Sequence, residues 1–276
     1  MAKKEGMNKV LKVILIVIGV IALLFVLAVV YYMINPSSTD NFYPNNELVM
    51  YGYKDYQDYL SNRPPEIAEI DDKFLASVLE VDNTRENASD SAVDRGWYYL
   101  FAGDSSTAMK RFNQAWLLNP TNYNVYWGFG VVTGQQSQTR DREDLIALSV
   151  EMFDKAIELY DDKSSVNKGD KLSLYCDAVY SNILKAETGS SSEVDKALDL
   201  LEEAKDMNFA VSNMTFINSE KARCHYYGAQ IWFEREDYSK SWEDIELARE
   251  LDPNNAYYQS DSQFIVALNS KMSEPK

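Results

Sequence analysis

The chain has 276 residues, with 27 lysines and arginines against 43 aspartates and glutamates, for a formal net charge of −16. Because phosphate backbones repel such an acidic protein, the composition disfavours nucleic-acid binding. Hydrophobic residues make up 46% of the chain and aromatic residues 13%, which is enough for a packed core and excludes a disordered acidic tail.

The first predicted element is a membrane-spanning helix at residues 13–34. From Val13 to Met33 the chain carries 21 residues without a charge. At 1.5 Å per residue this helix is about 30 Å long, which is sufficient to cross the hydrocarbon core of a bilayer. The apolar run is longer than that of a cleaved signal peptide and lacks a small-residue cleavage site, so we expect an uncleaved anchor. A buried core helix is the alternative interpretation.

The charges beside this segment predict its orientation. Four lysines fall in the basic tail, residues 1–12, and the next basic residue after the span is Lys54. Basic residues stay on the cytoplasmic side, so the amino terminus is predicted to be cytoplasmic. The chain beyond residue 34 has 23 basic and 42 acidic residues, for a net charge of −19. We therefore expect a single-pass protein of the cytoplasmic (inner) membrane with an acidic, extracytoplasmic domain in the periplasm.

A spacer is predicted at residues 35–65, because asparagine, proline and tyrosine are concentrated there. Its second half, from Leu48 to Leu60, is expected either to form a short helix or to pack onto the domain that follows. Residues 66–88 begin with an apolar helical face, which predicts a capping half-repeat over the open end of a helical stack. That face consists of Ile67, Ile70, Phe74 and Val78.

A spacing of small and bulky apolar residues recurs in the rest of the chain. Small, apolar and small residues fall at offsets 0, 4 and 7 in Ala108–Phe112–Ala115, Ser149–Phe153–Ala156, Ala197–Leu201–Ala204 and Ser241–Ile245–Ala248. Pro120 and Pro253 follow the first and last copies at offset 12. Small residues seven apart let a neighbouring helix approach closely, and a proline ends the helix at a fixed length. The pattern predicts stacked helical hairpins.

The residues around these copies make the pattern more specific. Gly96, Tyr99 and a Gly103-Asp104 turn precede the first copy, and Tyr126 and Gly130 precede the second. Together they resemble the tetratricopeptide repeat (TPR), a pair of antiparallel helices of about 34 residues. The alternative is an ordinary helical bundle whose alanines match by chance.

The resemblance implies an all-α, TPR-like solenoid of helical hairpins behind the single transmembrane helix. The domain covers residues 89–272. It comprises units at about 89–122, 123–167, 168–210 and 222–255, with a closing helix at 256–272.

The resemblance also implies a binding surface on the concave face of the stack. Carried onto this chain, the family's binding positions are Val93, Trp97, Leu100, Phe101, Asn124, Trp127, Val131, Arg223, Tyr226, Gln230 and Phe233. Most of them are aromatic or aliphatic, which favours an apolar or amphipathic segment of a protein partner. This composition disfavours binding of a peptide's terminal carboxylate, which some family members use. Alternatively, Trp97 and Trp127 pack against the spacer or a neighbouring unit.

The sequence predicts no catalytic or metal site. The single histidine, His225, falls at a packing position of the fourth unit, and the 11 glycines form no phosphate-binding loop. Pairs of carboxylates on the predicted helices are typical of exposed faces. We therefore expect no enzymatic activity, no cofactor and no small-molecule substrate.

Two cysteines, Cys176 and Cys224, fall on the first helices of consecutive units. They are expected either to form a disulfide in an oxidising compartment or to remain as two buried thiols. The predicted function is a scaffold or assembly factor that binds envelope proteins or peptides. A structural subunit of a larger membrane complex and a chaperone-like holdase are the alternatives.

Overall fold

The computed structural model describes residues 46–140, 143–160, 168–187, 191–207, 214–260 and 262–275. Within these ranges the chain forms helices and loops, without strands. The predicted basic tail and membrane-spanning segment, residues 1–34, lie outside the described residues. No helix in the described ranges combines the length and the apolar character that crossing a bilayer requires.

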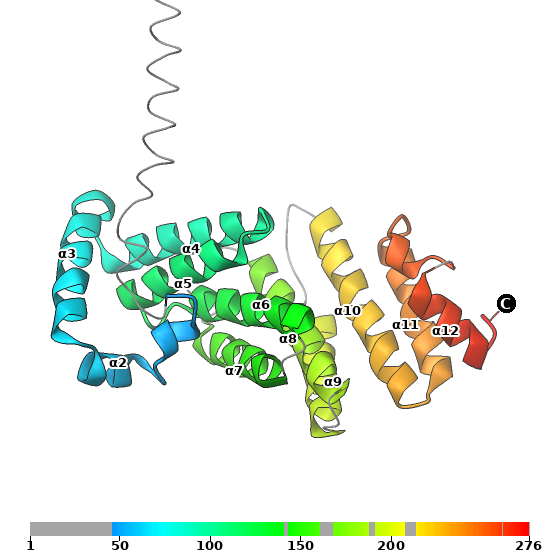
Figure 1. Ribbon diagram of the computed structural model, residues 1–276. Helices are drawn as coiled ribbons and strands as arrows, with labels where there is room; N and C mark the ends of the chain where they lie inside the picture. Colours follow the sequence, from blue (N-terminus) through cyan, green and yellow to red (C-terminus); the bar gives the residue numbers. More distant parts are fainter. Residues whose placement is uncertain are drawn as a thin grey trace, which may run out of the picture.

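The described helices form consecutive hairpins, as the repeated spacing predicted. The hairpins pair α4 (Arg85–Phe101) with α5 (Ser105–Leu118), α6 (Tyr123–Arg140) with α7 (Glu143–Leu159), α8 (Lys168–Glu187) with α9 (Ser191–Asp206), and α10 (Met214–Glu234) with α11 (Tyr238–Leu251). Figure 1 shows them arranged in chain order between α3 and α12. The predicted all-α architecture is therefore confirmed for the described part of the chain.

Close packing in the hairpins depends on the small–apolar–small spacing. All twelve residues of the four copies are buried, with at most 3% of their surface exposed. In the first hairpin the ring of Phe112 on α5 lies against Gly96 of α4 and Gly128 of α6. A Cβ atom at these two glycines would lie 2.6 and 2.3 Å from that ring. The glycines thus let three helices meet around one aromatic side chain.

The turns inside the first and fourth hairpins share their local chemistry. Asp104 and Asp237 begin the second helices, and their carboxylates accept hydrogen bonds from the backbone N–H groups of Thr107 and Lys240, at 2.9 and 3.3 Å. The residue before each aspartate has a positive φ, of 82° at Gly103 and 60° at Glu236. Of these two hairpins, the first therefore has a glycine where the backbone favours one, and the fourth has a glutamate.

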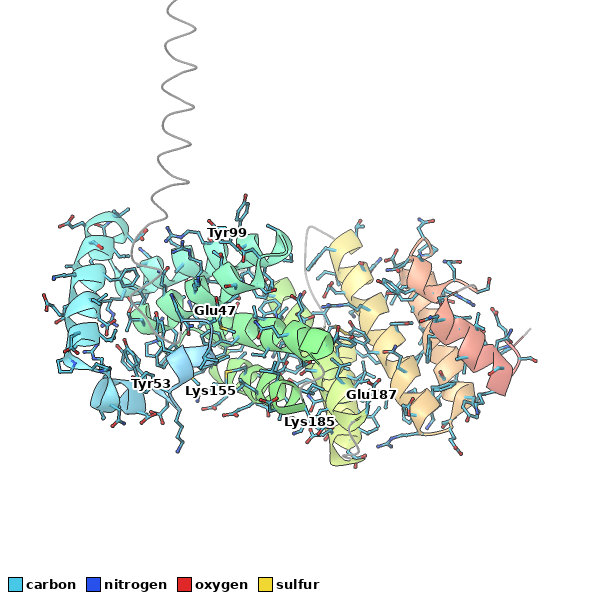
Figure 2. The ribbon with its side chains drawn as sticks, viewed as in Figure 1. Glu47, Tyr53, Tyr99, Lys155, Lys185 and Glu187 are labelled. Atoms are coloured by element: carbon cyan, nitrogen blue, oxygen red, sulfur yellow. A yellow bond between two sulfur atoms is a disulfide. The ribbon has the colours of Figure 1, made fainter. Side chains whose placement is uncertain are left out.

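The described part of the spacer packs on the outside of α5. It forms a 3-10 turn, η2 (Val49–Gly52), and a short helix, α2 (Tyr56–Asn62). Asn113 of α5 anchors it, because its Nδ2 donates to the carbonyls of Asn46 and Leu48 at 2.9 and 2.8 Å. Glu47, which Figure 2 labels, also accepts a hydrogen bond from Ser106 at 2.8 Å. Both features expected for the second half of the spacer, a short helix and packing onto the domain, are present.

The two ends of the stack differ in detail from the expected boundaries. Helix α3 (Pro65–Asp82) precedes the hairpins, but α4 already begins at Arg85, where Thr84 caps it. Residues 85–88 therefore belong to the first hairpin and not to a capping half-repeat. At the other end, the expected closing helix is divided into η3 (Ala256–Tyr258) and α12 (Gln263–Lys271), and Ser262 caps the latter.

Candidate functional site

The first helices of the four hairpins line one elongated cavity, which we call the trough. Its volume is about 700 Å³, and it extends from Trp97 and Phe101 on α4, past Trp127 on α6 and Asp177 on α8, to Arg223 on α10. Consecutive hairpins of this kind present one helix each to a shared concave surface. The trough therefore combines side chains that are up to 130 positions apart in the sequence, from Trp97 to Tyr227.

Seven of the eleven predicted binding residues line the trough. They are Trp97, Leu100, Phe101, Asn124, Trp127, Val131 and Arg223. Val93 is not among the lining residues, and its side chain is buried, with 2% exposed. The other three, Tyr226, Gln230 and Phe233, lie on α10 outside the trough lining.

Two of the three outlying α10 positions lie where the closing helix packs. Tyr226 and Phe233 contact Phe264 of α12, with ring centroids 5.6 and 5.5 Å apart. The repeat pattern predicts that the face of α10 with Tyr226 and Phe233 belongs to the binding surface. At this end of the stack, however, α12 packs against that face. The lining residues on α10 are instead Phe216, Glu220, Arg223 and Tyr227.

One wall of the trough is aromatic. The rings of Trp97 and Trp127 meet edge to face at 5.1 Å, and Phe101 stacks on Trp97 at 5.9 Å. The indole N–H of Trp97 donates to Asn124 Oδ1 at 3.0 Å, which fixes the orientation of that ring. Phe101 is 84% exposed, whereas Trp127 is 9% exposed. Phe101 and Trp97 are therefore the side chains of this wall that a partner can contact, and Trp127 packs against Trp97 in the interior.

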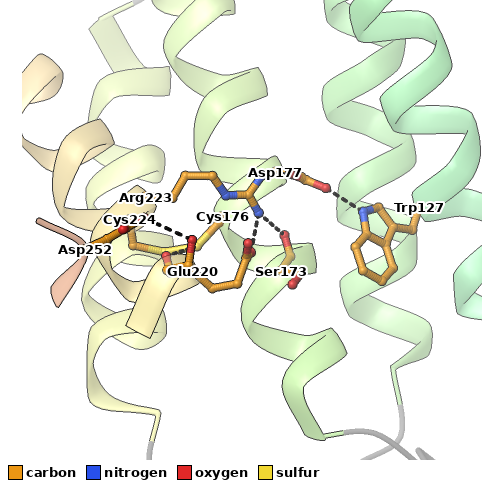
Figure 3. Close-up of polar contacts among 9 residues, drawn as sticks. Trp127, Ser173, Cys176, Asp177, Glu220, Arg223, Cys224 and Asp252 are labelled. Carbon is orange, nitrogen blue, oxygen red and sulfur yellow. Dashed lines mark hydrogen bonds and ion pairs between the residues drawn. A yellow bond between two sulfur atoms is a disulfide. The ribbon is translucent and has the colours of Figure 1, made fainter. Parts of the chain in front are cut away.

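The middle of the trough is polar. Asp177 of α8 accepts a hydrogen bond from the indole N–H of Trp127 at 2.8 Å and from Arg223 at 2.7 Å (Figure 3). Arg223 also donates to Glu220 at 2.5 Å. Burial alone lowers the pKa of Arg223, but the charges of Asp177 and Glu220 more than offset this effect, so the pKa lies above its ordinary value. The guanidinium is therefore held as a cation between two carboxylates.

A disulfide joins the two helices that carry this polar group. Cys176 of α8 and Cys224 of α10 are bonded, with their Cα atoms 5.5 Å apart (Figure 3). Each cysteine directly adjoins a member of the ion pair, since Asp177 follows Cys176 and Arg223 precedes Cys224. Of the two interpretations that the sequence allowed, the structure shows the bonded one. The bond fixes the spacing of α8 and α10 in the trough.

Several lining residues were missed by sequence reasoning. They are Asp170, Asp177 and Tyr180 on α8, and Phe216, Glu220 and Tyr227 on α10. The third unit matches the repeat pattern most weakly, so its binding face was not assigned. A usable signal was the helical spacing from Arg223 to Glu220, Phe216 and Tyr227, which places all four on one side of α10.

His225 has a structural environment and lies outside the trough lining. Its Nδ1 atom is 2.6 Å from Asp244 Oδ1, and Lys205 Nζ lies 3.0 Å from the same oxygen. The three residues come from α10, α11 and α9 and join the third and fourth hairpins. Among the residues that the structure describes, no group of three or more histidine, cysteine, aspartate or glutamate side chains could hold a metal ion.

Comparison with known proteins supports the fold. No family model and no curated protein sequence matches the chain. A solved structure of PilF from Pseudomonas aeruginosa, a TPR-containing protein, is similar with a TM-score of 0.50 and 16% sequence identity. The similarity covers 68% of this chain and 70% of that chain. The fold is therefore TPR-like.

Proposed function

We propose that the protein is a membrane-anchored, extracytoplasmic scaffold or assembly factor that holds a segment of an envelope protein in the trough. The observation that carries this proposal is the aromatic wall of the trough. Trp97 and Phe101 line an open cavity of about 700 Å³, and the described part of the spacer packs instead on α5. Exposed aromatic side chains in a concave surface are typical anchors for a partner protein.

The proposed location depends on the sequence and on the disulfide. Residues 13–34 have the length and composition of an anchor, and the lysines before them favour a cytoplasmic amino terminus. The bond between Cys176 and Cys224 supports an oxidising compartment for the domain, because disulfides persist there and are rare in the cytosol. These two features agree with a domain outside the cytoplasmic membrane.

The proposal is tested by replacing Phe101, the most exposed aromatic residue of the trough. Proteins crosslinked to the full-length chain in intact membranes are identified, and their recovery with Phe101→Ala is compared. We expect recovery of the trough partner to fall about tenfold or more, as for an aromatic anchor. Tyr98→Ala is the matched control, since Tyr98 is also on α4 and is 69% exposed but lies outside the trough lining.

Two other results would contradict the proposal. Recovery that is unchanged by Phe101→Ala but lost when residues 13–34 are exchanged for an unrelated anchor would indicate a structural subunit, held through its transmembrane helix. Suppression of aggregation of many unrelated unfolded proteins, lost with Phe101→Ala, would indicate a chaperone-like holdase and not a dedicated scaffold.

A further inference from the structure

The charge distribution of the trough indicates what kind of segment it accepts. Its described lining includes three carboxylates, Asp170, Asp177 and Glu220, and one guanidinium, Arg223. Arg223 is already shared between Asp177 and Glu220, at 2.7 and 2.5 Å. The cation of the trough is therefore engaged within the protein, and the remaining charge of the lining is negative.

Asp170 is the lining carboxylate that does not pair with Arg223. It lies in the first turn of α8, and within the described ranges no hydrogen bond or ion pair joins its carboxylate to another side chain. Loss of hydration raises the pKa of the Asp170 carboxyl above its ordinary value of 3.8. An anion that has lost part of its hydration is stabilised by a cation that enters the trough.

The aromatic wall favours the same kind of charge. The face of an aromatic ring attracts a lysine ammonium or an arginine guanidinium, and tryptophan does so most strongly. Phe101, which stacks on Trp97 and is 84% exposed, provides such a ring in the same cavity as Asp170. The apolar stem of a lysine or arginine can also pack on these rings while its charged end reaches a carboxylate.

An acidic partner is disfavoured by both local and overall charge. Arg223 would have to leave two carboxylates before it could bind a carboxylate of a partner. The chain beyond residue 34 carries a net charge of −19, which repels anionic segments and attracts cationic ones during association.

We propose that the segment held in the trough is cationic as well as apolar: a stretch of partner polypeptide in which lysine or arginine lies beside aromatic or branched aliphatic side chains. This inference rests on the proposed function, since it specifies the partner of the same trough. The cationic side chain pairs with Asp170, and the apolar side chains lie on Trp97 and Phe101.

The test uses a phage-displayed library of random short peptides, selected on the full-length protein in detergent micelles. Peptides whose binding is lost with Phe101→Ala but kept with Tyr98→Ala are taken as trough ligands. We expect these peptides to be enriched in lysine or arginine next to tryptophan, phenylalanine, leucine or isoleucine, and depleted in acidic residues.

Asp170→Asn then separates the charge from the apolar contacts. Asparagine keeps a polar side chain in the first turn of α8 but removes the anion. We expect the affinity of a lysine-containing trough peptide to fall about fivefold, as for a partly exposed ion pair. The affinity of the same peptide with glutamine in place of lysine should stay unchanged.

The outcomes distinguish this inference from the proposed function. Trough-dependent peptides that are neutral or acidic, or that bind Asp170→Asn as well as the unaltered protein, would overturn the cationic preference and leave the scaffold function standing. If no selected peptide depends on Phe101, both the trough as a binding site and the inference built on it are wrong.

Discussion

The first and fourth hairpins are built on the same plan but are joined to their neighbours differently. Both contain the small–apolar–small spacing, and in both an aspartate caps the second helix. In the first, the Phe112 ring lies between Gly96 and Gly128 and joins α4, α5 and α6. In the fourth, the carboxylate of Asp244 takes a comparable place, 2.4 Å from where a Cβ of Gly228 would lie.

This difference separates an apolar joint from a polar one. Phe112 is fully buried among aromatic and aliphatic residues, whereas Asp244, 5% exposed, is bonded to Lys205 and His225. The third and fourth hairpins are also linked by the disulfide and by the Arg223–Asp177 pair. The fourth hairpin contributes fewer residues to the large apolar core than the first, and hydrogen bonds, ion pairs and a disulfide join it to its neighbour. The disulfide and the Arg223–Asp177 pair also fix the geometry of the trough.

The largest expected effect comes from removing the ring at the apolar joint. Phe112→Ala leaves a cavity between three helices, so we expect the free energy of unfolding to fall by about 3–5 kcal/mol. Denaturation in urea, followed by circular dichroism on the full-length protein, measures this loss. Tyr98→Ala, which removes an exposed ring from the same hairpin, should change the free energy by less than about 0.5 kcal/mol. Equal effects of the two changes would refute an apolar joint.

The covalent link should have the next largest effect. Replacing both Cys176 and Cys224 by serine opens a loop with a sequence separation of 48 residues. We expect the free energy of unfolding to fall by about 2–4 kcal/mol, mainly because the unfolded chain gains freedom. Reductant should lower the stability of the unaltered protein by a similar amount and leave the double variant unaffected. Equal stability of the oxidised and reduced protein would show that the bond does not hold this joint.

The polar joint itself is tested by Asp244→Asn. The change removes the buried carboxylate 3.0 Å from Lys205 and leaves this lysine only the exposed Glu202, 3.7 Å away, so we expect a loss of about 1–3 kcal/mol in the same denaturation experiment. Asp154→Asn is the matched control, because Asp154 pairs with Lys196 on the surface, where the side chains are 46% and 36% exposed. That control should lose less than about 1 kcal/mol. Similar losses for both variants would mean that the joint behaves as a surface ion pair.

The smallest expected effect concerns the turn of the fourth hairpin, and it is a gain. Glu236 has a φ of 60°, whereas the corresponding turn of the first hairpin has Gly103. Glu236→Gly should raise the free energy of unfolding by about 0.5–1 kcal/mol, because glycine adopts this conformation without steric penalty. Glu234→Gly, at the last residue of α10, should instead lower it by less than about 1 kcal/mol. A loss in both variants would contradict the equivalence of the two turns.

Local patterns predicted the helical hairpins, because helices that pack closely have small residues seven positions apart, and this spacing can be recognised in the sequence. Phe112 and Ile245 were identified as core residues on that basis, and both are fully buried. Asn113 could not be identified, since its partners lie 65 and 67 residues away and it contacts their backbone, which is independent of side-chain type. The disulfide was left open for a similar reason, because the distance between two cysteines is a property of the packed structure.

The trough was predicted well on α4 and α6 and less well on α10. Trp97, Phe101 and Trp127 follow from the repeat frame, because each of these helices is succeeded by another full hairpin. Tyr226 and Phe233 were misplaced because the frame does not reveal that α12 covers them. Whether a helix face is exposed depends on the element that follows it. After the last hairpin this element is α12, which is not part of a repeat.

The central claim, that both ends of the trough hold one partner segment, is tested most directly by photocrosslinking in living cells. A photoreactive phenylalanine analogue is placed at Phe101 in the first hairpin or at Phe216 in the fourth, and at the exposed control positions Tyr98 and Tyr257. The account predicts that positions 101 and 216 capture the same protein and that positions 98 and 257 do not. Capture of different proteins from the two trough positions, or equal capture from the controls, would contradict it.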